Sequence, residues 1–225
     1  AIHSLRSTYK DLTTISQADL KIFSQYGEDG IIDFILTRLN IPKPTFIEIG
    51  TEDYSESNTR FLFQRTNTKG LIIDCDNELE AKVRKVLGNY YWKGDLVIKS
   101  SFITKDNIKG LLDTDNGGWL ESDLFSLDID GNDYWIMKEI LKFCNYKVII
   151  LEYNAYFGPE KEITIPYKED FFRTDYHHSN LCWGASLKSF ITLLSENNYT
   201  FVGTNINNSN GFWVRNDLYE ELGVN

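Results

Sequence analysis

Several features that define other protein classes are scarce in this sequence. No apolar run approaches the roughly 20 residues that a membrane-spanning helix needs. The three cysteines, Cys75, Cys144 and Cys182, are odd in number and match no zinc-binding spacing. We therefore expect reduced thiols in a cytoplasmic protein without a membrane span, and we expect neither a disulfide scaffold nor a zinc site.

Basic residues are in the minority. Lys and Arg number 23 against 33 Asp and Glu, which gives a net charge of −10. A chain this acidic, with no cluster of Lys or Arg, is not expected to bind nucleic acid or an anionic membrane. Its hydrophobic content of 42% is that of a folded globular protein.

Internal repeats and Gly/Ser-rich linkers are missing too, so the sequence predicts a single domain over residues 1–225. We expect residues 1–40, approximately, to form an N-terminal helical arm. The chain begins at Ala1 without a methionine, which leaves open further residues upstream. The sequence does not decide the oligomeric state, and a homo-oligomer remains open.

The most informative segments are residues 46–53 and 70–76. Each is an apolar, strand-like run that ends in a glycine or in carboxylates, and residues 55–66 between them are expected to be helical. This order of elements is typical of the first half of a nucleotide-binding unit. Only Gly50 of the G-x-G-x-x-G motif is present, so a ribose-bearing ligand without a pyrophosphate fits better than a dinucleotide. S-adenosylmethionine is the common ligand of that kind.

Further strands are expected at 95–99, 124–129 and 147–151, alternating with helices, and residues 199–204 and 212–215 are expected to form a hairpin. A turn at 116–118 is expected to precede the strand at 124–129. Strands that alternate with helices predict an α/β protein with a mostly parallel sheet and helices on both faces. The carboxyl ends of such strands meet at one edge, where ligands bind.

Several short motifs occur in the order expected of a known family. Ser24-Gln25-Tyr26-Gly27-Glu28-Asp29 is followed by FIEIGT, by an acidic end of the second strand, by SLDIDGNDY and by VIILEYN. This order resembles the FkbM-like S-adenosylmethionine-dependent methyltransferases over roughly residues 22–215. The resemblance implies a Rossmann-like class I methyltransferase with a seven-stranded sheet and a C-terminal antiparallel hairpin. It also implies O-methylation of a sugar or of a surface-polysaccharide precursor of the capsule or lipopolysaccharide type.

The resemblance and the strand ends together predict the donor site. Glu48 would face the cationic end of S-adenosylmethionine or simply pair with a basic neighbour, and Asn58 would touch the cofactor or only cap a helix. Asp74 or Asp76 would hold the ribose hydroxyls, and alternation along a strand predicts that both point to the same side. The candidate cofactor-binding residues are Gln25, Tyr26, Glu48, Gly50, Thr51, Asn58, Asp74, Cys75, Asp76, Ser100, Ser101, Phe102 and Asp128.

Oxygen ligands are dense in the run Asp128-Ile129-Asp130-Gly131-Asn132-Asp133. Asp128 and Asp130 with Glu152 form a candidate Mg²⁺ or Mn²⁺ site, and the alternative is a hydrogen-bonded lattice that shapes the acceptor pocket. Candidate catalytic residues are His177, His178 and Asp130. A histidine near its ordinary pKa suits deprotonation of a hydroxyl, although a loop histidine is more often a surface residue.

Residues 155–183, approximately, are rich in aromatic and charged side chains and show no period. We expect this segment to be an acceptor-specific insertion, with a satellite core under a long loop as the alternative. The candidate acceptor-binding residues are Asp133, Tyr153, Asn154, Tyr156, Asn180 and Trp183.

Two other functions compete with methyl transfer. Asp128-Ile129-Asp130 is a DxD triplet of the kind that metal-dependent glycosyltransferases use, although no basic residues stand nearby to meet a diphosphate. A non-catalytic S-adenosylmethionine-binding module is the second alternative.

Overall fold

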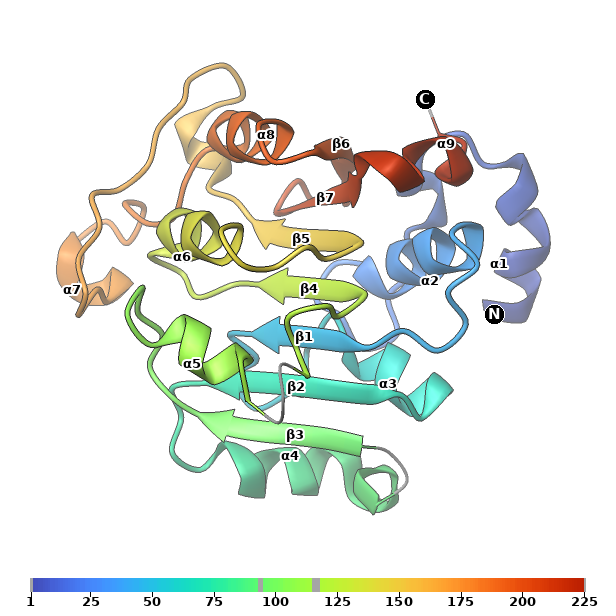
Figure 1. Ribbon diagram of the computed structural model, residues 1–225, viewed down its shortest axis with the longest axis horizontal. Helices are drawn as coiled ribbons and strands as arrows, with labels where there is room; N and C mark the ends of the chain where they lie inside the picture. Colours follow the sequence, from blue (N-terminus) through green and yellow to red (C-terminus); the bar gives the residue numbers. More distant parts are fainter. Residues whose placement is uncertain (1, 93–94, 115–117, 225) are drawn as a thin grey trace.

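A seven-stranded sheet forms the centre of the computed structural model, which describes residues 2–92, 95–114 and 118–224 (Figure 1). The strand order is β3-β2-β1-β4-β5-β7-β6, in which β7 is antiparallel to both of its neighbours and the other pairs are parallel. The strands are β1 Phe46–Ile49, β2 Lys69–Asp74, β3 Asp95–Ser100, β4 Leu124–Leu127, β5 Val148–Glu152, β6 Tyr199–Thr204 and β7 Asn210–Arg215. The predicted α/β fold with a C-terminal hairpin is thereby confirmed.

Helices cover both faces of the sheet. The helices are α1 Ile2–Thr8, α2 Glu28–Arg38, α3 Arg60–Thr66, α4 Leu79–Leu87, α5 Ile108–Leu112, α6 Asp133–Ile140, α7 Arg173–Tyr176, α8 Leu187–Ser195 and α9 Tyr219–Leu222. Apolar side chains of α2, α3, α4 and α9 pack in one core cluster, and those of α5, α6 and α8 pack in a second cluster. The central strands are apolar in sequence because both of their faces are buried under helices.

Two elements are shorter than the sequence predicts. The helix expected over 55–66 begins only at Arg60, because residues 51–59 form a loop held by the carboxylates of Glu48 and Asp74. The strand expected over 124–129 ends at Leu127, where Asp133 accepts a hydrogen bond from the backbone N–H of Ile129. Of the predicted turn at 116–118, residues 116 and 117 lie outside the described residues.

The segment 155–183 is bonded to residues that flank it on both sides. Asn154 donates to the carbonyl oxygens of Leu181 and Trp183, and Thr164 forms an isolated antiparallel bridge with Ala185. Ile165, Phe171 and Trp183 form a small cluster of their own beneath it. The segment therefore carries a satellite core, and an acceptor-specific role for it stays a prediction.

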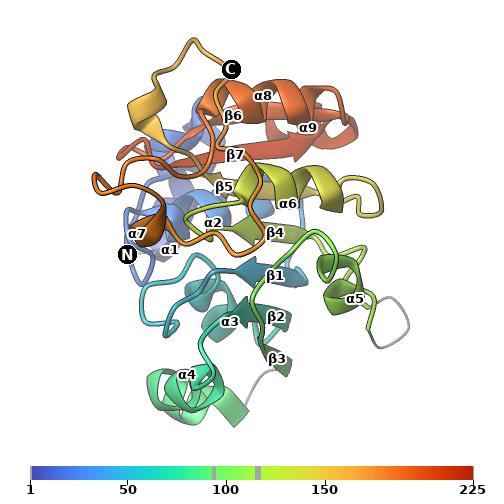
Figure 2. The same ribbon diagram turned by 90° about the vertical axis from the view of Figure 1, so that its left-hand side faces the viewer.

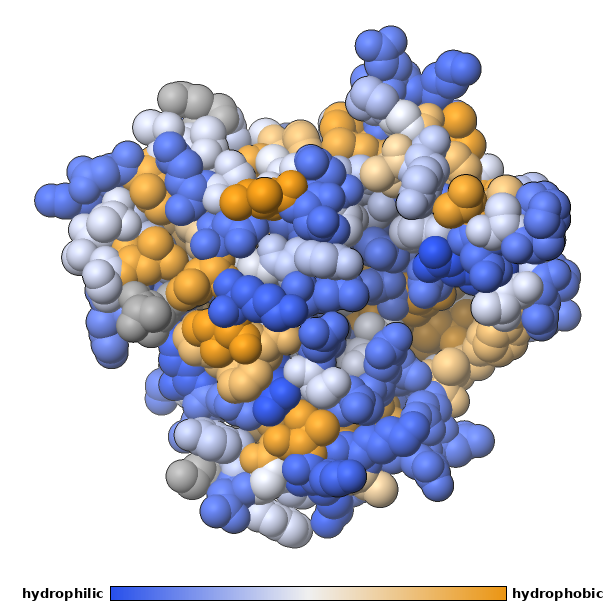
Figure 3. All heavy atoms as spheres, turned by 180° about the vertical axis from the view of Figure 1, so that it is seen from behind, coloured by the Kyte–Doolittle hydropathy of each residue, from blue (hydrophilic) through white to orange (hydrophobic). Residues whose placement is uncertain are grey.

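The parallel strands end at one edge of the sheet, which faces the viewer in Figure 2, and α7 lies at this edge. The rear face, seen in Figure 3, is mainly hydrophilic with separate hydrophobic patches. Among the helices of the described residues, none has the length and apolar character needed to cross a membrane.

Candidate active site

The turn after β1 brings the backbone of two neighbouring strands into close contact. Gly50 adopts a φ of 82°, and a Cβ atom at this position would lie 1.5 Å from the carbonyl oxygen of Asp128. Its N–H donates to the carbonyl oxygen of Ile73, 2.9 Å away. Only glycine combines this backbone conformation with such a close approach.

Glu48, in β1, holds the loop that precedes α3. Its carboxylate accepts hydrogen bonds from Ser57 Oγ at 2.7 Å, from the N–H groups of Asn58 and Thr59 at 2.9 and 3.0 Å, and from Thr59 Oγ1. Burial raises the pKa of this carboxyl group, and the four donors oppose that effect. These partners are hydroxyl and backbone donors rather than a basic side chain, and contact with the cofactor stays a prediction.

Asp74 braces the loop between β1 and α3 from the end of β2. Its Oδ2 accepts from the N–H groups of Thr51 at 3.0 Å and Glu52 at 2.9 Å. Asp76 bonds instead to Lys82 and to the N–H of Glu78, and it lies outside the pocket. The expectation that both aspartates point to one side is wrong, because β2 ends at Asp74 and strand alternation stops there.

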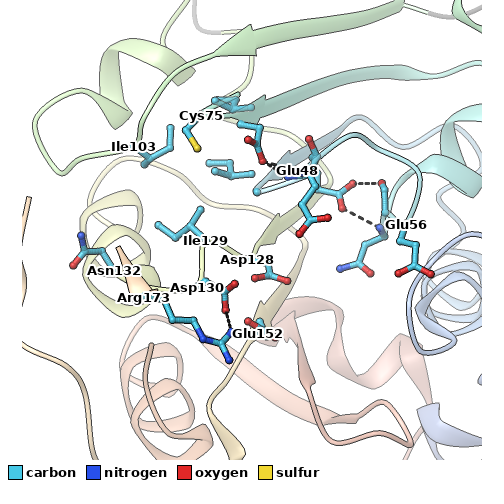
Figure 4. A pocket seen from close by; sticks show the side chains of 18 of the residues that line it. Glu48, Glu56, Cys75, Ile103, Asp128, Ile129, Asp130, Asn132, Glu152 and Arg173 are labelled. Atoms are coloured by element: carbon cyan, nitrogen blue, oxygen red, sulfur yellow. Dashed lines mark hydrogen bonds and ion pairs between the residues drawn. The ribbon is translucent and has the colours of Figure 1, made fainter. Parts of the chain in front are cut away.

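A pocket of about 650 Å³ opens at the carboxyl ends of the strands (Figure 4). This volume lies within the range of roughly 300–1,000 Å³ that is common for small-molecule sites. Of the residues predicted for the site, those that line it are Gln25, Tyr26, Glu48, Gly50, Thr51, Asn58, Asp74, Cys75, Ser101, Phe102, Asp128, Asp130 and Glu152.

Three carboxylates converge on one side of this pocket. Asp128, Asp130 and Glu152 each place an oxygen within 4.8 Å of the others (Figure 4). Burial raises the pKa of both Asp128 and Glu152, and repulsion between the neighbouring carboxylates raises it further. Arg173, from α7, forms an ion pair with Asp130 at 2.5 Å and so partly neutralises the cluster.

The lining of the pocket is strongly acidic. Its carboxylates are Glu48, Glu52, Glu56, Asp74, Asp128, Asp130 and Glu152. Among the described residues that line it, Arg173 alone carries a positive side chain, and it is already paired with Asp130. This balance favours a cationic ligand and disfavours the diphosphate that a glycosyltransferase would bind.

The remaining predicted site residues lie outside the pocket lining, and several have structural partners. These residues are Asp76, Ser100, Asp133, Tyr153, Asn154, Tyr156, His177, His178, Asn180 and Trp183. Asp133 is fully buried and accepts from the N–H groups of Ile129 and Gly131, both at 2.8 Å. Burial raises its pKa to about 6.

The two histidines are exposed. His177 bonds through Nδ1 to Ser179 Oγ at 2.8 Å, and its ring lies 4.2 Å from that of His178. Trp183 instead supports Arg173, whose guanidinium lies 4.7 Å from the centre of the indole ring. The Asn180 carbonyl oxygen accepts from Arg173 Nε. These two residues position a pocket residue and do not line the pocket themselves.

Phe171 and Phe172, two of the aromatic residues of the expected insertion, line the pocket. Sequence reasoning missed Arg173 and Thr174 from the same segment, and Asn207, Ser209 and Asn210 from the hairpin turn. The density of Asn and Ser in that turn is the available signal. By itself it indicates only a turn, because the sequence does not reveal that β7 lies beside β5.

Comparison with known proteins supports the fold. No protein-family model matches the sequence, and no curated protein does. A Bacillus cereus O-methyltransferase in complex with S-adenosylhomocysteine is similar in structure, with a TM-score of 0.53 and 12% identity over 94% of this chain and 88% of that one.

Two further solved structures resemble the chain. A proposed caffeoyl-CoA O-methyltransferase of Staphylococcus aureus gives a TM-score of 0.54 at 12% identity, over 96% of this chain and 92% of that one. An S-adenosylhomocysteine-bound methyltransferase of Podospora anserina gives a TM-score of 0.52 at 13% identity, over 95% of this chain and 87% of that one. The chain therefore has the fold of the class I S-adenosylmethionine-dependent methyltransferases.

Proposed function

We propose that this protein is an S-adenosylmethionine-dependent O-methyltransferase. The observation that carries the proposal is the acidic pocket at the carboxyl ends of β1, β2, β4 and β5, in a sheet with the methyltransferase strand order. Ligands of open α/β sheets bind at this edge. Carboxylates around the pocket are suited to a sulfonium ligand, whose positive charge they stabilise.

The donor half of the pocket lies at the ends of β1, β2 and β3. We assign the methionine end of the cofactor to the turn at Gly50 and Thr51, and the ribose to Asp74. Thr51 supports this assignment because its Oγ1 is buried and has no hydrogen-bond partner among the described residues. Ser101 and Phe102, which follow β3, are assigned to the adenine ring. When bound, the cofactor supplies an electrophilic methyl group.

The acceptor half lies beyond β4 and β5. Of the predicted catalytic residues, Asp130 lines the pocket and is therefore placed to contact an acceptor hydroxyl. His177 and His178 are exposed outside it, so we assign the acceptor proton to neither of them. The exposed rings of Tyr26 and Phe172, at 40% and 51%, offer stacking faces at the pocket. These faces and the FkbM-like motifs support a sugar or surface-polysaccharide precursor as the acceptor.

The carboxylate cluster also fits a divalent cation. Asp128, Asp130 and Glu152 supply the oxygen ligands that Mg²⁺ and Mn²⁺ prefer, within 4.8 Å of one another. A cation held there would orient the acceptor hydroxyl and favour its ionised form. Arg173 competes for the same site, since it already binds Asp130.

Isothermal titration with S-adenosylhomocysteine tests the donor assignment. We expect binding to the wild-type protein and weaker binding to Thr51→Val, which keeps the shape of the side chain but removes Oγ1. The absence of any binding to folded wild-type protein would refute the proposal. Binding without methyl transfer to a broad panel of sugar acceptors, with Mg²⁺ present or chelated, would instead favour a non-catalytic binding module.

A further inference from the structure

The hairpin turn brings an amide side chain beside the carboxylate cluster. Asn210, the first residue of β7, is the backbone partner of Glu152, the last residue of β5. Both side chains line the pocket. Because β7 runs antiparallel to β5, its start lies at the edge where the parallel strands end.

The orientation of the Asn210 amide is fixed by a buried carboxylate. Its Nδ2 donates to Glu28 Oε1 at 2.8 Å, and Glu28 is fully buried. Glu28 also accepts from Asn205 Nδ2 at 2.6 Å and from the N–H of Tyr26 at 2.9 Å. A carboxylate surrounded by donors requires the NH₂ side of the amide, so Asn210 Oδ1 must point away from Glu28.

Asn210 Oδ1 is left without a donor. The residue is 7% exposed, and this oxygen is buried with no hydrogen-bond partner among the described residues. Glu152 Oε2 on the neighbouring strand is in the same situation. Buried acceptors are almost always paired in folded proteins, so two unpaired acceptors in one pocket wall indicate a ligand that donates hydrogen bonds.

Glu152 belongs to the carboxylate cluster, whereas the pocket residues on the Asn210 side are uncharged. Asn207 and Ser209 line the pocket from the same turn, and Gln25 and Tyr26 line it from the loop that Glu28 holds in place. Amides, a hydroxyl and an exposed aromatic ring recognise neutral polar groups and flat apolar faces. They offer no fixed positive charge for an anionic acceptor.

We propose that Asn210 Oδ1 and Glu152 Oε2 accept hydrogen bonds from two neighbouring hydroxyl groups of an uncharged, polyhydroxylated acceptor such as a neutral glycoside. The inference rests on the proposed function, because it assigns the acceptor half of the same pocket. Asn210 is then a specificity-determining residue. An acceptor that lacks one of the two hydroxyls leaves a buried oxygen unpaired, and binding discriminates against it.

The test titrates neutral methyl hexopyranosides and, separately, 1,4-diaminobutane into the protein, with and without S-adenosylhomocysteine. Binding is followed by saturation-transfer NMR and calorimetry. We expect a glycoside to bind the wild-type protein and to bind Asn210→Leu about tenfold more weakly, which corresponds to the loss of one hydrogen bond. S-adenosylhomocysteine affinity should be the same for both proteins.

Asn208→Gly is the matched control, because it removes an amide from the same turn at a φ of 56° that glycine adopts easily, and Asn208 does not line the pocket. It should bind glycosides like the wild type. Glu152→Leu, which removes both acceptor oxygens, provides a second variant should Asn210→Leu fail to fold, and it should also weaken glycoside binding.

Two outcomes would overturn the inference. One is equal glycoside affinity of the wild type and both pocket variants, and the other is binding of the diamine without any glycoside. If the wild type binds no S-adenosylhomocysteine, the proposed function fails. The glycoside titration of the unloaded protein then still decides this inference separately.

Discussion

Gly50 and Asp128 are in direct backbone contact across the pair β1 and β4, with the space for a Cβ atom at residue 50 taken by the Asp128 carbonyl oxygen. Gly50 belongs to the turn assigned to the methyl donor, and Asp128 begins the carboxylate cluster assigned to the acceptor. This contact therefore sets the distance between the two halves of the pocket.

Gly50→Ala should destabilise the protein by about 2–4 kcal/mol, because it combines overpacking with a left-handed backbone. Denaturation in urea measures the change. Gly110→Ala is the control, since Gly110 lies in α5, is exposed, and a Cβ atom at this position would meet no neighbouring atom within 4 Å. Alanine there should leave stability unchanged or raise it by up to about 1 kcal/mol. Equal stability of Gly50→Ala and the wild type would contradict the close contact.

Glu48→Gln should weaken the loop before α3. A glutamine amide turns an NH₂ group toward the donors from Ser57, Asn58 and Thr59, which removes acceptors from a buried cluster. We expect a loss of about 1.5–3 kcal/mol in the free energy of unfolding and weaker S-adenosylhomocysteine binding. Glu56→Gln, at an exposed pocket carboxylate, should retain wild-type stability. A Glu48→Gln variant as stable as Glu56→Gln would disprove the bracing role.

The pH dependence of stability should contain a contribution from Asp133. Its pKa is raised from 3.8 to about 6 by burial, with the Asp130 charge as a further cause, so the folded protein holds a proton that the unfolded chain has released. Stability therefore falls as pH rises from about 4 to about 6, by at most about 3 kcal/mol.

Urea denaturation between pH 4 and 7 measures this contribution as the difference between wild type and Asp133→Asn. The free energy of unfolding of the variant should decline less steeply with pH over that range, even if the variant is less stable throughout. Asp175→Asn, at an exposed carboxylate, should keep the wild-type slope. Identical slopes in all three proteins would rule out a raised pKa at Asp133.

Arg173→Gln should strengthen binding of Mn²⁺. The Arg173 guanidinium is paired with the Asp130 carboxylate, and the Arg173 side chain is 32% exposed. Removing the guanidinium therefore frees one carboxylate ligand and loses only a weak ion pair. We expect up to about fivefold tighter binding by water-proton relaxation. Lys168→Gln, at an exposed pair with Asp170, should bind Mn²⁺ like the wild type. Weaker binding by Arg173→Gln would show that the arginine supports the site rather than competes for it.

The sequence was sufficient to predict the sheet and the edge at which the pocket opens. Continuous apolar runs such as the one at 148–151 indicate buried parallel strands, and the order of strands and helices then places the ends of these strands together. The carboxylates of Asp128, Asp130 and Glu152 could be assigned to one site on that basis, and the structure brings them together.

Side-chain direction at strand ends could not be predicted. The side chains of Asp74 and Asp76 point in different directions because β2 ends at Asp74. Asp133 accepts hydrogen bonds from the backbone of the loop that precedes it, at Ile129 and Gly131. The contribution of Asn210 depends on pairing between strands far apart in the sequence. Arg173 reaches Asp130 through a segment without regular periodicity, where local sequence carries little information about position.

Because β7 begins opposite the end of β5, the length of the turn before β7 determines which residue is paired with Glu152. Deleting one residue from the turn at 205–209 would place Gly211 opposite Glu152, and side chains alternate between the faces of a strand. Gly211 has no side chain, so it cannot supply the amide oxygen of Asn210. A protein that descends from this one and keeps its acceptor is therefore expected to keep the length of this turn.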